Sequence, residues 1–336
     1  MKVRKLAMFR GLYLGDLIAA TGAWRALRRG YPEAEITLVT LPWATALAPH
    51  LTSVDRLLPY PGAPGLDGGG DEENLEEFLA RVRAERFDLA VNMHGRGPIS
   101  TRLVVRFGAR LTAGFTGGPE TDAPTLDFEV PWDAEAHESR KLLLLAKKVG
   151  GVPVGASGGA EPELRVHVED DRRARVLLLA GTQKPLALVH PGASVREKRW
   201  PAEAFGRAAK GLLRRGYAVA VTGSSKEKEL TGQVAGLAPG AVDLGGRTDL
   251  STLVALVARS DVMISNDTGP AHLAYALRTP SVTLFGPSTD VERWGPLNRS
   301  RHAVLFGNPI SEVSADAVVE GAEELVPGRK RERLGA

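Results

Sequence analysis

The chain has 336 residues and contains no cysteine. This absence excludes disulfide bonds, thiolate-ligated metals and cysteine nucleophiles, so oxygen and nitrogen groups must supply any chemistry. Long apolar runs are missing too, because stretches such as LLLLA at 142–146 are far shorter than the ~20 residues of a membrane span. We therefore expect a cytoplasmic protein, with peripheral contact to a membrane surface left open.

Several ligand-binding patterns are also absent. Gly11 and Gly15 do not form G-x-G-x-x-G, and no G-x-x-x-x-G-K-[ST] occurs, which disfavours dehydrogenases and P-loop enzymes. No two aspartates are separated by a single residue, so there is no D-x-D pattern to hold a divalent metal on a sugar nucleotide. The histidines show no metal-ligand spacing. The sequence thus implies neither a metal nor a cofactor.

Composition and charge are those of an ordinary globular protein. Hydrophobic residues make up 43% and charged residues 25% of the chain, which gives no reason to expect disorder. The net charge of +3 is too small and too scattered to indicate a nucleic-acid surface. The length is more than one hydrophobic core usually serves, so we expect two domains.

Short apolar runs alternate with helix-like stretches along both halves of the chain, a pattern typical of parallel α/β sheets. The predicted strands cover 5–10, 35–40, 54–60, 87–94, 109–115, 186–192, 217–224, 241–246, 261–266 and 281–287. The region 150–183 includes a stretch rich in Gly, Pro and small residues. We therefore predict two doubly wound domains, 1–168 and 169–336, with the boundary inside that region.

The stretch SNDTGPAHLAYAL at 265–277 follows a predicted strand and begins a helix with Pro270 in its first turn. A helix N-terminus favours phosphate, and Gly269 lets an anion approach the backbone. The Asp267 carboxylate would repel phosphate, so it either accepts hydrogen bonds from sugar hydroxyls or caps the helix. His272 is either a ligand or a core histidine.

Two further turns follow predicted strands. In HPGASVREKRWP at 190–201, the small residues Ala193 and Ser194 precede Lys198 and Arg199. Exposed backbone N–H groups followed by a cation can clamp a diphosphate, whereas such cations are more often solvated surface charges. In the first domain, Asp16 begins a helix whose N-terminus is expected to keep it ionised and able to act as a base, with capping as the alternative.

Arginines follow the predicted strand at 87–94 in HGRGPISTRLVVRFGAR. Arg96 and Arg102 could meet phosphate groups on an acceptor. Arg102 and Arg106 are four residues apart, however, which is typical of a solvated helix face.

Four segments together resemble the heptosyltransferase family, the bacterial glycosyltransferases of family nine. They are GDLI at 15–18, HPGAS followed by KRWP at 190–201, NDTGPAH at 266–272 and LFGPSTDVERWGP at 284–296. The order and spacing of these segments cover nearly the whole chain. The chain departs from the family pattern at Ala19, Ala20 and Gly22, where members commonly have His, Thr and Pro, and at Ala271, where they often have Ser.

The resemblance implies a GT-B architecture of two Rossmann-like domains facing each other across a cleft, with the acceptor bound by the first domain and the donor by the second. It also implies metal-independent, inverting transfer of heptose from ADP-heptose to a lipid-linked lipopolysaccharide core at the inner membrane. Asp16 matches the catalytic base, Lys198 the cation facing the diphosphate, and Asp267, Thr268, Gly269 and His272 the donor-binding turn. A GT-B nucleotide-sugar epimerase and a non-catalytic sugar-nucleotide sensor remain alternatives.

Overall fold

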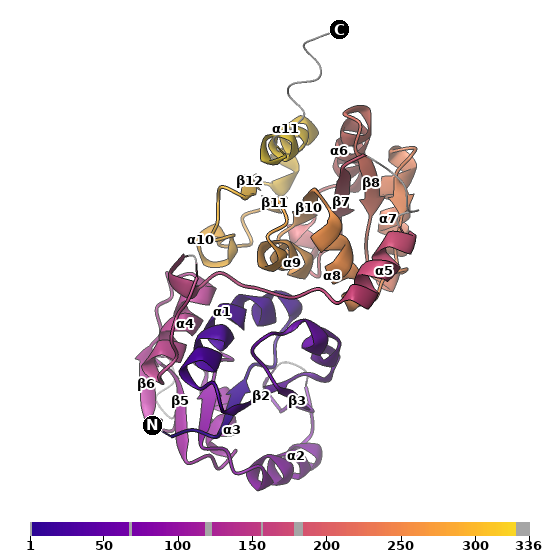
Figure 1. Ribbon diagram of the computed structural model, residues 1–336. Coiled ribbons are helices and arrows are strands. Elements are labelled where there is room, and N and C mark those ends of the chain that lie inside the picture. Colours follow the sequence, from indigo (N-terminus) through magenta and orange to yellow (C-terminus); the bar gives the residue numbers. More distant parts are fainter. Residues whose placement is uncertain (1, 67–68, 118–122, 156, 178–183, 327–336) are drawn as a thin grey trace. The chain divides into compact units, whose positions relative to one another are not determined.

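The chain is divided into two compact units, Met1–Pro162 and Glu163–Ala336, each built around its own sheet. The computed structural model describes residues 2–66, 69–117, 123–155, 157–177 and 184–326 (Figure 1). The division between the units falls inside the 150–183 region in which the sequence predicts a boundary.

The first unit contains a six-stranded parallel sheet in the order β3-β2-β1-β4-β5-β6. Its strands are β1 (Lys5–Phe9), β2 (Glu35–Thr40), β3 (Arg56–Pro59), β4 (Leu89–Asn92), β5 (Leu111–Thr116) and β6 (Phe128–Pro131), and its helices are α1 (Leu14–Gly30), α2 (Glu72–Ala84), α3 (Pro98–Val105) and α4 (Glu138–Lys148). This strand order is that of a doubly wound Rossmann-like sheet, which has its switch point between β1 and β4.

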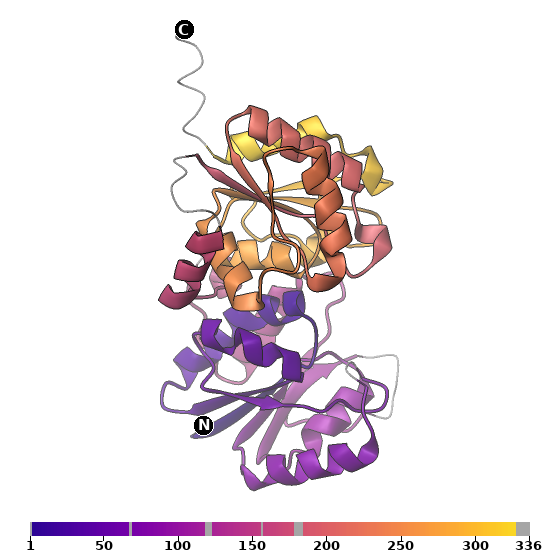
Figure 2. The ribbon, with the colours of Figure 1, turned by 90° about the vertical axis from the view of Figure 1, so that its right-hand side faces the viewer.

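The central strands of the first unit are apolar on both faces because helices cover both. On β1, Ala7 and Phe9 join the core formed with Phe78 of α2 and Val104 of α3. The other face of the sheet is covered by α1 and α4, which pack side by side (Figures 1 and 2). Gly22 of α1 permits a close approach, since a Cβ there would lie 2.8 Å from the carbonyl oxygen of Gly159.

The second unit repeats the architecture, with the strand order β12-β11-β10-β7-β8-β9. Its strands are β7 (Leu186–His190), β8 (Ala218–Val221), β9 (Val242–Asp243), β10 (Val262–Asn266), β11 (Ser281–Phe285) and β12 (His302–Phe306). Its helices are α5 (Val168–Leu177), α6 (Ala202–Arg214), α7 (Lys228–Leu237), α8 (Leu250–Arg259), α9 (Gly269–Leu277), α10 (Val291–Trp294) and α11 (Ala315–Leu325). All pairings are parallel, for example Val262 with Ala187.

One face of the second sheet carries an extensive hydrophobic core. Helices α6, α7 and α11 contribute to it, with Phe205 and Leu212 of α6 packed against the central strands. The buried Trp200 caps this core, its ring lying edge-on to Phe205 and its indole N–H donating to the carbonyl oxygen of Val313. Helices α8 and α9 pack against the sheet through their own contacts with β7, β10 and β11.

The predicted α/β class and its two doubly wound domains are confirmed by the two sheets. The sequence analysis missed two outer strands, β6 and β12. Both are edge strands in which only one residue is buried, so they lack the continuous apolar run of a central parallel strand.

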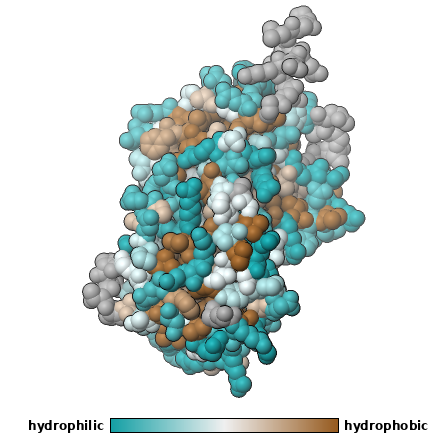
Figure 3. Space-filling model, turned by 60° about the vertical axis from the view of Figure 1, so that its left-hand side comes forward, coloured by the Kyte–Doolittle hydropathy of each residue, from teal (hydrophilic) through white to brown (hydrophobic). Residues whose placement is uncertain are grey.

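Hydrophobic side chains at the surface form small groups between hydrophilic ones on the face shown in Figure 3. Within the described ranges, no helix has both the length and the apolar character needed to cross a membrane.

Candidate functional site

The second unit gathers polar groups at its switch point, where the loops after β7 and β10 leave the sheet in opposite directions. Asn266, the last residue of β10, ties these loops together. Its side-chain amide donates to the carbonyl oxygen of Pro191 at 2.9 Å, and its Oδ1 accepts from the backbone N–H of Trp200 at 2.9 Å. Ligands of open α/β sheets bind at this position, so the geometry points to a binding site here.

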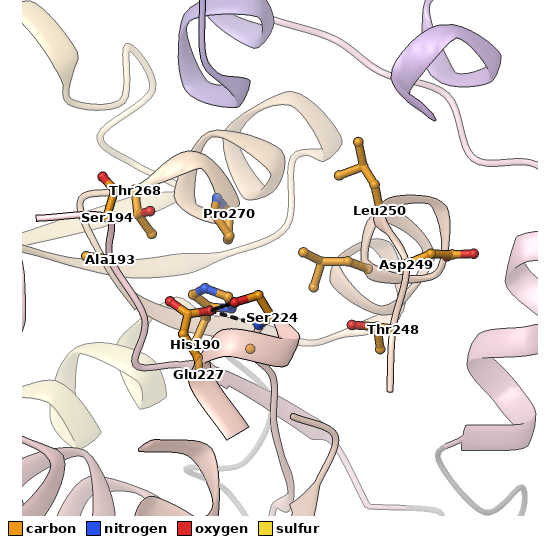
Figure 4. A pocket seen from close by; sticks show the side chains of 12 residues that line it. His190, Ala193, Ser194, Ser224, Glu227, Thr248, Asp249, Leu250, Thr268 and Pro270 are labelled. Atoms are coloured by element: carbon orange, nitrogen blue, oxygen red, sulfur yellow. Dashed lines mark hydrogen bonds between the residues drawn. The ribbon is translucent and has the colours of Figure 1, made fainter. Parts of the chain in front are cut away.

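A pocket of about 270 Å³ lies at this switch point. It is lined by residues from the loops after β7 and β8 and from the starts of α8 and α9, namely His190, Ala193, Ser194, Gly223, Ser224, Glu227, Thr248, Asp249, Leu250, Leu253, Thr268 and Pro270. Figure 4 shows Ala193, Ser194 and Thr268 on one side and Leu250 with Thr248 on the other, with Glu227 and Ser224 between them. The pocket therefore combines helix N-termini, an apolar wall and two acidic residues, Glu227 and Asp249.

Of the two acidic residues, Asp249 caps α8 by accepting from the backbone N–H of Thr252, and Glu227 belongs to the loop after β8. Its Oε2 accepts from the backbone N–H and the hydroxyl of Ser224, each at 2.8 Å. Burial acts to raise the pKa of Glu227, but these hydrogen bonds and the nearby charges outweigh it and hold the pKa below its usual value. Gly192 has no side chain because a Cβ there would collide with the Glu227 carboxylate. Glu227 is thus an ionised acceptor, packed against the backbone of the β7 loop.

His190 lies beneath the pocket at the end of β7. Its Nδ1 lies 3.1 Å from the hydroxyl of Thr222. Burial lowers the pKa of His190, opposed by the nearby Glu227. A neutral imidazole is therefore part of the pocket floor.

Lys198 and Asp267 form an ion pair, with 2.8 Å between Nζ and Oδ2. The two side chains are 28% and 7% exposed, so the interpretation of Lys198 as a solvated surface charge is wrong. The capping interpretation of Asp267 is also wrong, since Thr268 occupies the N-cap position of α9. Thr268 makes no side-chain capping bond, which leaves the N-terminal N–H groups of α9 without that partner.

His272 does not line the pocket. It is buried in α9, where its ring lies edge-on to those of Tyr275 and Trp294, with centroids 5.3 and 6.2 Å away. This environment fits the core-histidine interpretation. Gly269 begins α9 and also lies outside the pocket lining.

In the first unit, Asp16 lies in the first turn of α1, beyond its N-cap residue Tyr13. The guanidinium of the fully buried Arg10 lies 3.6 Å from the Asp16 carboxylate and donates through Nε to the Asp16 carbonyl oxygen at 2.8 Å. Burial raises the pKa of Asp16, Arg10 opposes this, and Glu138 adds to the rise. Desolvation therefore outweighs the stabilisation of the carboxylate that the helix N-terminus provides. A raised pKa suits a general base near neutral pH.

The two arginines predicted to meet an acceptor have different surroundings. Arg96 donates to the carbonyl oxygen of Gly117 at 3.1 Å and lies over the Trp132 ring, 5.6 Å from its centroid. Arg102 is exposed in the last turn of α3. Arg106 pairs instead with Glu76, so it belongs to a surface ion pair.

The structure brings Ala193, Ser194 and Thr268 together in the pocket, close in sequence to the Lys198–Asp267 pair. Sequence reasoning missed Glu227, Ser224 and the start of α8. A signal was present, because Ser224 and Glu227 have the S-x-x-E spacing of a capping box, which forms here. Throughout the described residues, no group of three or more His, Asp or Glu side chains is placed to hold a metal ion.

Two Rossmann-like units, one of them with a polar pocket at its switch point, define an α/β protein of the GT-B class. Residues 76–318 match glycosyltransferase family 9 (heptosyltransferase), and the chain belongs to this family. The protein is therefore a glycosyltransferase.

One curated relative and two solved structures are similar to this chain, and the solved structures confirm the predicted GT-B fold class. Lipopolysaccharide heptosyltransferase 2 of Escherichia coli K12 is 26% identical over 99% of this chain and 98% of its own length. The structure of E. coli ADP-heptose LPS heptosyltransferase II superposes with a TM-score of 0.78 at 22% identity, covering 96% of this chain and 98% of the other. The structure of E. coli heptosyltransferase WaaC with ADP-2-deoxy-2-fluoro heptose gives 0.71 at 20% identity, covering 95% and 99%.

Proposed function

We propose that this glycosyltransferase moves heptose from ADP-heptose onto a lipopolysaccharide-core or related cell-envelope glycan, with inversion at the anomeric carbon and without a metal. One observation carries the proposal. The second-unit pocket places an apolar wall, an ionised carboxylate and a helix N-terminus around one space, and these groups match the base, the sugar hydroxyls and the diphosphate of a nucleotide sugar.

In this proposal, each part of the ADP group of the donor has a partner in the second unit. The adenine packs on Leu250 and Leu253, and the ribose hydroxyls donate to Glu227. The diphosphate lies against Ser194 and Thr268 at the start of α9. Lys198 stabilises the negative charge that develops on the diphosphate as it leaves, which is the role that a metal ion has in other enzymes.

Asp267, Gly269 and His272 support this site in different ways. Asp267 orients Lys198 through their ion pair, and Gly269 gives the diphosphate access to the backbone of α9. Ala193 is small enough to leave room beside the phosphates. His272 positions α9 through its aromatic contacts instead of contacting the donor.

The chemical step uses Asp16 of the first unit, the acceptor-binding unit in this proposal. The acceptor hydroxyl oxygen attacks the anomeric carbon while the bond from that carbon to the diphosphate oxygen breaks. The bonding electron pair leaves with ADP, and the hydroxyl proton passes to the Asp16 carboxylate. A single displacement of this kind inverts the anomeric centre. Arg96 and Arg102 bind anionic groups of a lipid-linked acceptor.

Two relatives support the choice of ADP-heptose as donor and of a lipopolysaccharide acceptor. One solved relative, WaaC, holds an ADP-heptose analogue, ADP-2-deoxy-2-fluoro heptose, and the E. coli relative that spans this chain is named a lipopolysaccharide heptosyltransferase. An acceptor of that kind is anchored in a membrane, so we propose that the protein works at the cytoplasmic face of the inner membrane.

The test begins with calorimetric titration of the protein with ADP-heptose, ADP, UDP and UDP-glucose in EDTA. Adenine-selective binding, followed by heptose transfer to a heptose-free core acceptor in EDTA, is expected. Preference for a uridine donor or a requirement for divalent metal would contradict the proposal. Conversion of the donor without acceptor would favour the epimerase, and binding without any turnover would favour the sensor.

A further inference from the structure

Four charged side chains form a chain of contacts that starts at Asp16. Arg10 lies between two acids, with Nη2 3.6 Å from Oδ1 of Asp16 and 3.2 Å from Oε1 of Glu138. Glu138 in turn lies 3.2 Å from Nζ of Lys141 in the first turn of α4. The last three side chains are 5% exposed or less. Asp16 is therefore the one member of this set of four that has substantial exposure, at 22%.

Arg10 is held from several directions. Besides the two acids, it donates to the carbonyl oxygens of Asp16 and Met93. These contacts join the end of β1 to α1, to the end of β4 and to α4, so the guanidinium has little freedom to turn. Lys141 is fixed as well, because its ammonium lies 4.1 Å from the centroid of the Trp132 ring.

Burying charges is costly unless they are balanced. The set contains two acids and two bases, so its formal charge is zero. The four charges, however, contact one another in a row: Lys141 contacts Glu138, Glu138 contacts Arg10, and Arg10 contacts Asp16. Each charge therefore acts on Asp16 through the residues that lie between them. A change of charge at Glu138 or Lys141 must therefore alter the electrostatic environment of the Asp16 carboxylate, although neither residue contacts a substrate in the proposed reaction.

We propose that Glu138 and Lys141 are positioning residues that set the basicity and orientation of Asp16 through Arg10. This inference rests on the proposed function, in which Asp16 is the base. The groups that face Asp16 are Arg10 from the end of β1 and Glu138 from α4, while the neighbouring His94 from the loop after β4 accepts the N–H of Gly11 and faces Arg10. The burial of His94, with the nearby Arg10, lowers its pKa to about 4, so it adds no charge near neutral pH.

The arrangement predicts opposite effects for the two variants. Glu138→Gln removes a negative charge and so lowers the pKa of Asp16, since Glu138 now raises it. Lys141→Met removes a positive charge and leaves the negative charge of Glu138 less balanced, which raises the pKa of Asp16. A purely structural role would lower activity in both variants without moving the pH profile in opposite directions.

The experiment measures kcat/KM against pH for heptose transfer. The acid limb is expected to move to lower pH in Glu138→Gln, with kcat falling about tenfold as part of the ~10²–10⁴-fold contribution of a positioned base. It should move to higher pH in Lys141→Met and return toward the wild type in the double variant and in Glu138→Asp. Lys147→Met, an exposed change on α4, is the matched control and should leave the profile in place.

A second measurement does not depend on turnover. The ¹³C carboxyl resonance that disappears in Asp16→Asn reports the titration of Asp16 directly, and it should shift in the same two directions in folded protein. Unchanged or equal shifts in the two variants would overturn the inference. If the resonance moves as expected but the wild type transfers no sugar, the network stands and the proposed function fails.

Discussion

The Nζ atom of Lys198 lies 2.8 Å from Oδ2 of Asp267, across 69 residues of sequence. The pair joins the loop that leaves β7 to the residue that follows β10, the two strands on either side of the second-unit switch point. Because Asp267 is 7% exposed, the ammonium is held in one place instead of moving freely in water. The Lys198 ammonium is therefore already in place to bind a diphosphate, without the entropy cost of ordering its long side chain.

Lys198→Met should weaken ADP-heptose binding about 10–100-fold, because the charge-assisted contact to the diphosphate is lost. It should also lower the free energy of unfolding by about 1–2 kcal/mol, since Asp267 is left unpaired. Calorimetry and denaturant melts measure the two effects. Lys198→Met combined with Asp267→Asn should recover stability but not affinity, and the exposed Lys210→Met on α6 is the control. Unchanged donor affinity in Lys198→Met would show that the cation does not face the diphosphate.

Asp16→Asn should reduce kcat by ~10²–10⁴-fold, the contribution of a general base, and should leave donor affinity unchanged, because the donor pocket belongs to the other unit. Steady-state transfer rates and calorimetry with ADP check the two halves of this prediction. Wild-type turnover in this variant would remove Asp16 from the role of base. Weakened donor binding would instead show that its effect reaches the second unit.

Gly192→Ala should weaken donor binding, because the new Cβ takes the place that the Glu227 carboxylate occupies. We expect a loss of about tenfold in affinity, equal to one hydrogen-bonded contact of about 1.4 kcal/mol. Gly236→Ala is a matched control, since a Cβ there meets nothing within 4 Å. Equal affinities in the two variants would argue against Glu227 as a donor contact.

Stability should fall as the pH is lowered from about 6.5 to about 4. Burial and the nearby Arg301 lower the pKa of His302 to about 4, whereas an unfolded histidine titrates near 6.5. Over this range the unfolded state binds a proton at His302 that the folded state does not bind. Each pH unit therefore lowers the free energy of unfolding by up to about 1.4 kcal/mol for this residue.

Chemical denaturation at several pH values measures this slope. His302→Gln should flatten it, while His167→Gln, at an exposed position, should not. Equal slopes in the two variants would mean that His302 does not carry the effect. His94, whose pKa burial and Arg10 likewise lower to about 4, accounts for part of the slope that remains.

The sequence by itself determined the fold class. Apolar runs such as LALVH at 186–190 are buried on both faces of a parallel sheet, and this local property is visible without any partner. It also placed Asp16, Ser194 and Thr268 just after strands, because the loops at the carboxyl ends of strands can be located from the strands alone. The edge strand β12 could not be found in this way, since only one of its residues is buried.

Only the tertiary structure decided how distant residues act on one another. Strand order brought Ser194 and Thr268 into one pocket and added Glu227 to it from the start of α7. Burial on folding raised the pKa of Asp16, an effect that its position at a helix N-terminus does not reveal. The contacts of Arg10 with Asp16 and Glu138 span 128 residues at the longest. Such pairings depend on solvent exclusion and on the order of strands in the sheet, and neither is encoded in a short stretch of sequence.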